Sequence, residues 1–129
     1  MAFDLRVVVP NRPGTLVETC DTLVQAGIEL FGFSGDIRPG ERWGYLHVLV
    51  EDEKAAQAAL AAAGIEVTSV HKVDVNAVDK HMGALAEEVK KYSDAGRNIG
   101  VLYLTSDGSI VIGTDDMLEE RHGIRMGDK

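Results

Sequence analysis

The chain has 129 residues, 45% of them hydrophobic and 26% charged, and its 13 basic and 21 acidic side chains give a net charge of −8. This length suits one domain with an appendage, and no apolar run approaches the roughly 18 residues that cross a bilayer. The negative charge repels phosphate backbones and anionic lipids, so we expect neither nucleic acid nor a membrane as a partner.

The first half of the chain predicts a strand, a helix and a hairpin. Apolar residues alternate along residues 3–9, which is typical of a strand with one buried face. A helix follows from Gly14, where the apolar residues change to helical spacing, and Gly27 ends it. Two further strands, over residues 28–37 and 43–50, are joined by a turn and form the hairpin.

An alanine-rich helix over residues 54–63 and a fourth strand over residues 65–75 complete the order strand, helix, strand, strand, helix, strand. Right-handed crossovers in that order give a four-stranded antiparallel sheet with both helices on one face. We therefore predict an α+β, ferredoxin-like βαββαβ sandwich as a domain over residues 1–75.

The tail, residues 76–129, predicts a helix over residues 77–95, a β-hairpin around Asp107-Gly108 and a short helix over residues 115–122 that Thr114 caps. An isolated hairpin is only marginally stable in water. We therefore expect the tail to pack on the first domain or on a partner subunit. No internal repeat is evident in the sequence.

The segment Val9-Pro10-Asn11-Arg12-Pro13-Gly14-Thr15-Leu16 passes from a strand into a helix. A helix start exposes unpaired N–H groups and the positive end of the helix dipole, which favours a bound carboxylate. Gly14 removes a side chain that would obstruct those groups, Pro13 fixes the chain's entry, and Asn11 offers a donor and an acceptor. The alternative is structural, because Asn and Pro-Gly are also common in turns.

This segment resembles the ACT domains, which are small ligand-sensing modules of amino-acid metabolism. The resemblance rests on Asn11-Arg12-Pro13-Gly14-Thr15-Leu16, on Ala26-Gly27-Ile28-Glu29-Leu30 one helix later, and on the strand order across residues 3–75. It implies that two such domains pair side by side into one sheet, with an amino acid at the seam between them.

The resemblance also implies roles for individual residues. Asn11 would hold the ligand's polar groups, the N–H groups at the helix start would face its carboxylate, and the second segment would close the site from the partner subunit. The candidate ligand-binding residues are Asn11, Arg12, Pro13, Gly14, Thr15, Leu16, Gly27, Ile28, Glu29 and Leu30. Serine-sensing members have histidine where Val9 lies and asparagine where Glu29 lies, so serine specificity is not implied. The tail does not resemble a standard ACT element.

Other reactive side chains favour structural explanations. The four histidines lack the close spacing of a metal site, and Cys20 lies on the apolar stripe of the first predicted helix. A single cysteine and an N-terminus without a secretory pattern predict a cytoplasmic protein. The acidic cluster Asp115, Asp116, Glu119 and Glu120 fits a solvated helix start. We expect no metal, no cofactor and no catalytic residues.

Together these features predict a regulatory protein, not an enzyme, that senses an amino acid or similar carboxylate at the seam of a homodimer. Such a protein is allosteric, since its ligand must bind one conformation more tightly than another, and it has a possible protein target. The alternative is a protein-interaction module that kept the fold without a ligand. It docks a partner through the sheet edge and through the apolar stripe from Val78 to Tyr92 of the third predicted helix.

Overall fold

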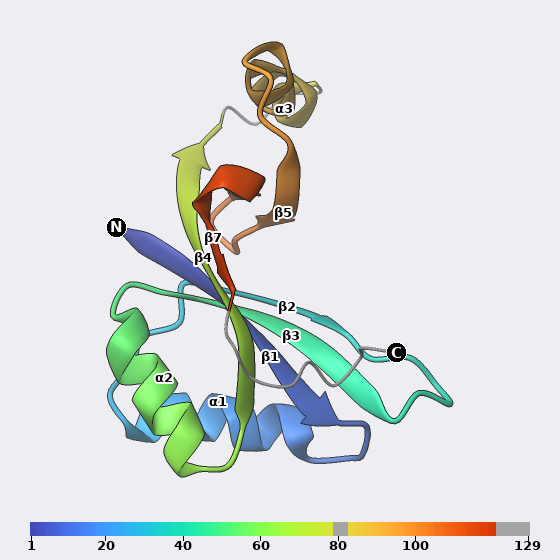
Figure 1. Ribbon diagram of the computed structural model, residues 1–129, viewed down its shortest axis with the longest axis vertical. Helices are drawn as coiled ribbons and strands as arrows, with labels where there is room; N and C mark the ends of the chain where they lie inside the picture. Colours follow the sequence, from blue (N-terminus) through green and yellow to red (C-terminus); the bar gives the residue numbers. More distant parts are fainter. Residues whose placement is uncertain (79–82, 121–129) are drawn as a thin grey trace.

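The computed structural model describes residues 1–78 and 83–120. Its strands form one curled antiparallel sheet in the order β2-β3-β1-β4-β6-β5, and β7 also pairs with β4 (Figure 1). The elements are β1 Ala2–Pro10, α1 Thr15–Gln25, β2 Gly32–Asp36, β3 Trp43–Val50, α2 Glu53–Ala62, β4 Glu66–Ala77, α3 Ala84–Asp94, β5 Ile99–Leu104, β6 Ser109–Thr114, the 3-10 turn η1 Asp115–Met117 and β7 Leu118–Glu120.

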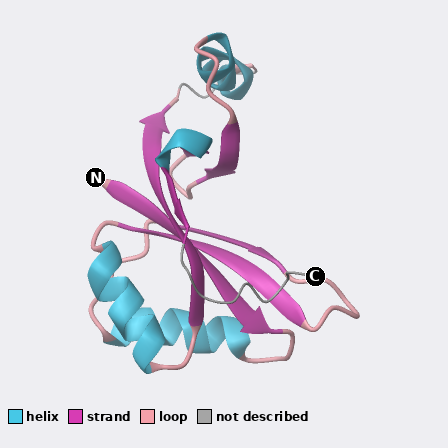
Figure 2. Cartoon of the chain, viewed as in Figure 1, coloured by secondary structure: helices cyan, strands magenta, loops and turns pink. Residues whose placement is uncertain are grey.

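The first four strands and two helices confirm the predicted ferredoxin-like sandwich. Both α1 and α2 cover the same face of the sheet (Figure 2). The alternation of β1 places Leu5 and Val7 on that face, where they pack fully buried against Leu23 of α1 and Leu60 of α2. We call the opposite face the helix-free face; it carries Asp4 of β1, with its neighbours Leu49 of β3 and His71 of β4.

The long strand β4 joins the first sheet to the tail. Its first part pairs with β1 from Val8↔Glu66 to Ala2↔Val73, and its last part, residues 74–77, pairs with β6. β7 then pairs with residues 69–71 of β4. Because η1 separates β6 from β7 by only three residues, β6 and β7 follow the same edge of β4, opposite β1.

The hairpin of β5 and β6 covers part of the helix-free face. Leu49, Val73 and Val111 form a buried cluster there, with Ala2 and Tyr103 packed against it. The predicted Asp107-Gly108 turn is confirmed, since the Thr105 amide donates to Ser109 O across the turn at 2.9 Å.

Several element boundaries differ from the prediction. The second strand begins at Gly32, because Ile28 and Leu30 before it pack against the core beneath the sheet. The third helix begins at Ala84, after Gly83, since pairing with β6 keeps residues 74–77 extended; Met82, on the predicted stripe, lies outside the described residues.

The final helix is shorter than predicted. Residues 115–117 form a 3-10 turn without a Thr114 side-chain cap, because Thr114 is buried in β6 and accepts a hydrogen bond from Arg97. Residues 118–120 are extended by pairing with β4, and residues 121 and 122 of the predicted helix lie outside the described residues.

The expectation of no internal repeat is wrong. The last part of β4 with α3, β5 and β6 repeats the order of β1, α1, β2 and β3, with the same neighbours in the sheet. The helices have equal length and start from glycines of nearly equal φ, 96° at Gly14 and 92° at Gly83. The identical pairs at one constant offset include Gly14/Gly83, Leu16/Leu85, Glu18/Glu87, Ala26/Ala95 and Gly27/Gly96.

The two copies differ where the first carries α2. In the described part of the second copy, α3 alone covers the sheet, and the position equivalent to buried Leu5 is occupied by Asp74. Tyr92 of α3 donates to Asp74 Oδ2 at 2.7 Å and accepts from Asn76 at 3.0 Å. Polar contacts therefore replace part of the apolar core that a second helix would bury.

Candidate functional site

The turn before α1 presents free amide groups. Gly14 has a φ of 96° and begins the helix without a side-chain cap. The Thr15 amide donates to Arg12 O at 3.4 Å, whereas Leu16 and Val17 have no backbone acceptor ahead of the helix among the described residues. The N–H groups open to a ligand are therefore those of Gly14, Leu16 and Val17, and that of Thr15 is already engaged.

Asn11 is more engaged than the sequence indicated. Its Nδ2 donates to Arg38 O at 2.9 Å and to Glu41 O at 2.7 Å, and its backbone amide donates to Arg42 O at 2.9 Å. The side chain thus ties the loop to the turn between β2 and β3. What remains for a ligand is the Asn11 Oδ1 acceptor.

Arg12 places a positive charge beside the turn. Its guanidinium pairs with Glu18 at 3.1 Å, and both side chains are about half exposed. An ion pair this exposed contributes little stability, so an anion can compete for the guanidinium at small cost. Pro13 is exposed, and its carbonyl accepts a 3.4 Å hydrogen bond from Arg12.

The second predicted segment, residues 27–30, lies at the opposite end of α1. Gly27 ends the helix with a φ of 77°, Ile28 and Leu30 pack against the core, and Glu29 is exposed. An 11-residue helix is about 16 Å long, so one chain does not bring the two segments into a single site.

Exposed apolar side chains lie along the outer surface of this region. Leu16, Val17 and Val24 of α1 are 42%, 62% and 62% exposed, and Phe33 lies in β2. β2 is an edge strand of the sheet, and edge strands offer unpaired backbone groups to another chain. The surface is thus suited to a second protein chain.

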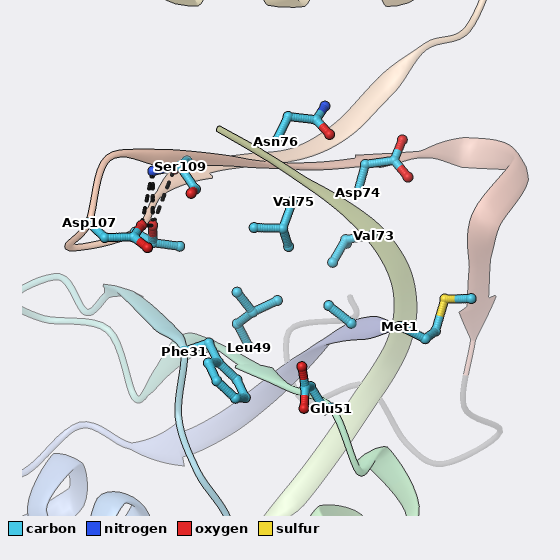
Figure 3. Close-up of a pocket in the computed structure, with 12 residues that line it drawn as sticks. Met1, Phe31, Leu49, Glu51, Val73, Asp74, Val75, Asn76, Asp107 and Ser109 are labelled. Carbon is cyan, nitrogen blue, oxygen red and sulfur yellow. Dashed lines mark hydrogen bonds between the residues drawn. The ribbon is translucent and has the colours of Figure 1, made fainter. Parts of the chain in front are cut away.

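A cavity of about 480 Å³ lies elsewhere, where β1, β3, β4 and the β5–β6 turn meet (Figure 3). Phe31, Leu49 and Val73 supply apolar walls, and the acids Glu51, Asp74 and Asp107 surround them. Among the described residues, no Lys or Arg side chain lines it. Hydrogen bonds from Thr105 and Ser109 hold the pKa of Asp107 below its usual range, so this side chain disfavours a carboxylate ligand beside it.

Asp4 is a buried charged residue that was not predicted from the sequence. It is fully buried on the helix-free face, where His47 Nδ1 lies 2.8 Å from Oδ2 and the Tyr103 hydroxyl donates to Oδ1 at 2.7 Å. Burial and the adjacent Asp4 raise the pKa of Tyr103 far above its usual value, so the phenol keeps its proton. Alternation predicts only that Asp4 faces away from the helices; partners 43 and 99 residues away leave no local signal.

Other candidate chemistry finds little support. Burial and then Asp21 raise the pKa of Cys20, which makes its thiol a poor nucleophile. Across residues 1–78 and 83–120, no cluster of three or more His, Cys, Asp or Glu side chains could hold a metal ion. Within the same residues, no helix is long and apolar enough to span a bilayer.

Solved structures share this fold. Protein BT0572 from Bacteroides thetaiotaomicron is similar with a TM-score of 0.71 and 22% identity, over 87% of this chain and 76% of that one. The regulatory subunit of aspartate kinase from Thermus thermophilus gives a TM-score of 0.65 and 18% identity, over 88% and 82%. Aspartokinase alpha and beta subunits give 0.61 and 20%, over 89% and 82%.

A comparison with curated proteins gave no significant match. The family model described as an ACT domain pair, however, matches residues 1–126. This match agrees with the two successive strand-helix-strand-strand units of the sheet. The chain therefore belongs to the ACT domain pair family.

Proposed function

We propose that this protein is a regulatory protein that binds an amino acid or similar small carboxylate at the seam between two copies of itself. The observation that carries the proposal is the turn at Gly14, where the positive φ leaves the amides of Leu16 and Val17 open at the start of α1. The helix dipole and the Arg12 guanidinium both favour a carboxylate at this place.

The seam explains how the two predicted segments act together. A two-fold axis that sets the α1 helices of two copies antiparallel brings the Gly14 turn of one copy beside residues 27–30 of the other. The exposed apolar side chains of α1 and the free edge of β2 support pairing on this side. In this arrangement Glu29, exposed at the far end of α1, is available for the ligand's ammonium group.

The experiment is a thermal-shift screen against the common amino acids and small carboxylates. A ligand at 100 times its Kd adds about 2.7 kcal/mol to the unfolding free energy, which raises Tm by several degrees. Light scattering of the hit complex tests whether the binding species is a dimer. A flat screen, or binding by a monomer with one ligand in each chain, contradicts the proposal.

The site is tested with Gly14→Ala, which puts a methyl group near the open amides. The positive φ strains any substituted residue there by about 1 kcal/mol, so lost stability alone is uninformative. Gly64→Ala is the matched control, because Gly64 also has a positive φ, 76°, and open space around it. We expect Gly14→Ala to weaken the ligand-induced shift and Gly64→Ala to preserve it.

The alternative, a ligand-free interaction module, keeps the predicted sheet edge but loses part of the predicted helix stripe. Tyr92 is buried within its own chain and Val78 packs beside it, which leaves Leu85, 42% exposed, as the open apolar side chain of the described stripe. A partner that binds equally well after Gly14→Ala but not after Leu85→Asp would favour this alternative.

A further inference from the structure

A second cavity, of about 310 Å³, lies between the helix-free face and the tail. The sheet supplies Arg6 from β1, His47 from β3, and Ser69 and His71 from β4. The tail supplies Asp115 from η1 and the apolar side chain of Leu118 from β7. This cavity is separate from the Gly14 turn and is formed within a single chain.

Arg6 is held in place with part of its guanidinium free. Its Cζ lies 4.0 Å from the centroid of the Tyr45 ring, and its Nη1 donates to Thr68 Oγ1 at 3.2 Å. Among the described residues, Nε and Nη2 have no acceptor. A guanidinium with one planar side free is suited to a bidentate contact with a carboxylate.

His47 also presents one defined nitrogen. The buried Asp4 carboxylate only accepts hydrogen bonds, so the proton between the two groups lies on His47 Nδ1, 2.8 Å from Asp4 Oδ2. Tyr103 completes the hydrogen bonding of Asp4 at 2.7 Å. A carboxylate partner of this kind fixes the tautomer and orientation of an imidazole, which leaves His47 Nε2 for a ligand.

His71 is 3% exposed, yet one ring nitrogen remains unpaired. Its Nε2 donates to Thr114 O at 2.7 Å, while Nδ1 has no hydrogen-bond partner in the described part of the chain. No buried side-chain nitrogen or oxygen lacks a partner among the described residues. Nδ1 is therefore not fully buried, and His71 lines this cavity.

Gly113 and Gly100 of the β5–β6 hairpin leave space for the side chains of His71 and Asp115. A Cβ at Gly113 would lie 2.8 Å from His71 Nε2, and a Cβ at Gly100 would lie 3.1 Å from Asp115 Oδ1. Neither glycine has a positive φ, so the need is for space rather than for backbone conformation. The missing side chains of Gly113 and Gly100 thus allow His71 and Asp115 to lie at the cavity wall.

We infer that this cavity binds a free α-amino acid, with its carboxylate on Arg6, its ammonium on Asp115 and its side chain against Leu118. Among the described residues, the cavity lining has one guanidinium and one carboxylate, a pair that matches a zwitterion better than a simple anion or amine. Asp115 keeps this capacity because Asn98 occupies only its Oδ2, at 2.8 Å. No guanidinium from residues 1–78 or 83–120 lines the acidic cavity of Figure 3.

The experiment measures Kd by calorimetry for the amino acid that gives the largest thermal shift, and for its deaminated and decarboxylated analogues. We expect Arg6→Met and Asp115→Asn each to raise Kd at least about tenfold, and both analogues to bind at least about tenfold more weakly. The exposed residues Lys54 and Asp116 lie outside both proposed sites and supply the controls, and Lys54→Met and Asp116→Asn should leave Kd unchanged. Asp115 is exposed, so its variant tests the cavity even where Arg6→Met fails to fold.

Gly14→Ala separates this inference from the proposed seam. Binding that is lost in the two cavity variants and retained in Gly14→Ala supports the cavity and assigns the ligand to it. Binding that is lost only in Gly14→Ala supports the seam and overturns the cavity. The cavity inference is also overturned if the deaminated analogue binds as tightly as the amino acid, or if no amino acid binds at about 10 mM.

Discussion

The Tyr103 hydroxyl donates a 2.7 Å hydrogen bond to the Asp4 carboxylate across 99 residues of sequence. Asp4 is fully buried, and its second oxygen lies 2.8 Å from His47 Nδ1. A buried carboxylate requires such partners, because removal from water costs several kcal/mol when a charge is left unpaired. The tail therefore supplies part of the environment that keeps a charge inside the first sheet.

Replacing Tyr103 with phenylalanine removes this partner without changing the ring. We expect Tyr103→Phe to lower the unfolding free energy by about 1–3 kcal/mol, since it leaves a buried acceptor unsatisfied. Denaturant unfolding measures the loss. Tyr45→Phe is the control, because the Tyr45 ring contacts Arg6 while its hydroxyl has no hydrogen bond in the described chain. Equal losses of unfolding free energy in both variants would contradict the explanation.

Alkaline pH should destabilise the protein through the partly buried Tyr103 and the buried Tyr92. Burial raises the pKa of Tyr103 and, less strongly, that of Tyr92, to which the hydrogen bond with Asp74 also contributes. The unfolded state releases these protons near pH 10 while the folded state keeps them, so stability is full below about pH 10 and falls as pH rises above it. Between pH 10 and 11.5 the slope should flatten in Tyr103→Phe by up to about 1.4 kcal/mol per pH unit. An unchanged slope would show that Tyr103 ionises normally.

Gly113 should not tolerate a side chain. Its Cβ would lie 2.8 Å from His71 Nε2, and His71 is buried and bonded to Thr114 O. We expect Gly113→Ala to cost about 1–3 kcal/mol in chemical denaturation. Gly100→Ala should cost less, because the Asp115 carboxylate that it approaches is exposed and can move away. A larger loss at Gly100 would count against the packing argument.

The docking of α3 should depend on one hydroxyl. Tyr92 donates to Asp74 and accepts from Asn76, and these contacts replace the apolar core found beneath α1. In Tyr92→Phe we expect amide hydrogen exchange to accelerate along α3 and to stay unchanged along α1. Exchange that rises equally in both helices would indicate global destabilisation instead.

Local patterns predicted the first sheet well because its signals lie within single elements. The alternation of β1 and the glycines that end α1 and α2 needed no knowledge of distant contacts. The tail was harder, since Asp74 is polar at a position where its counterpart Leu5 is apolar. Because of this polar residue, and because the third helix begins after Gly83 and not at residue 77 as predicted, the repeat was not recognised from the sequence. The shared sheet topology reveals it.

The sequence predicted which residues form the candidate site, but only part of how their atoms are arranged. The sequence located the turn at Gly14, whose positive φ matches the role of glycine there. It did not show that Asn11 Nδ2 is committed to the β2–β3 turn, because Arg38 and Glu41 lie a whole hairpin away. The cavity around Arg6 was missed for the same reason, since strand register assembles it from residues scattered between β1 and β7.

β4 belongs to both halves of the sheet, with β1 paired along one part and β6 along the next. No linker separates the halves, so there is no hinge for them to turn about. A disturbance of either half changes the twist of a strand that the other half also uses. The two halves should therefore unfold in one cooperative transition, as a single thermodynamic unit.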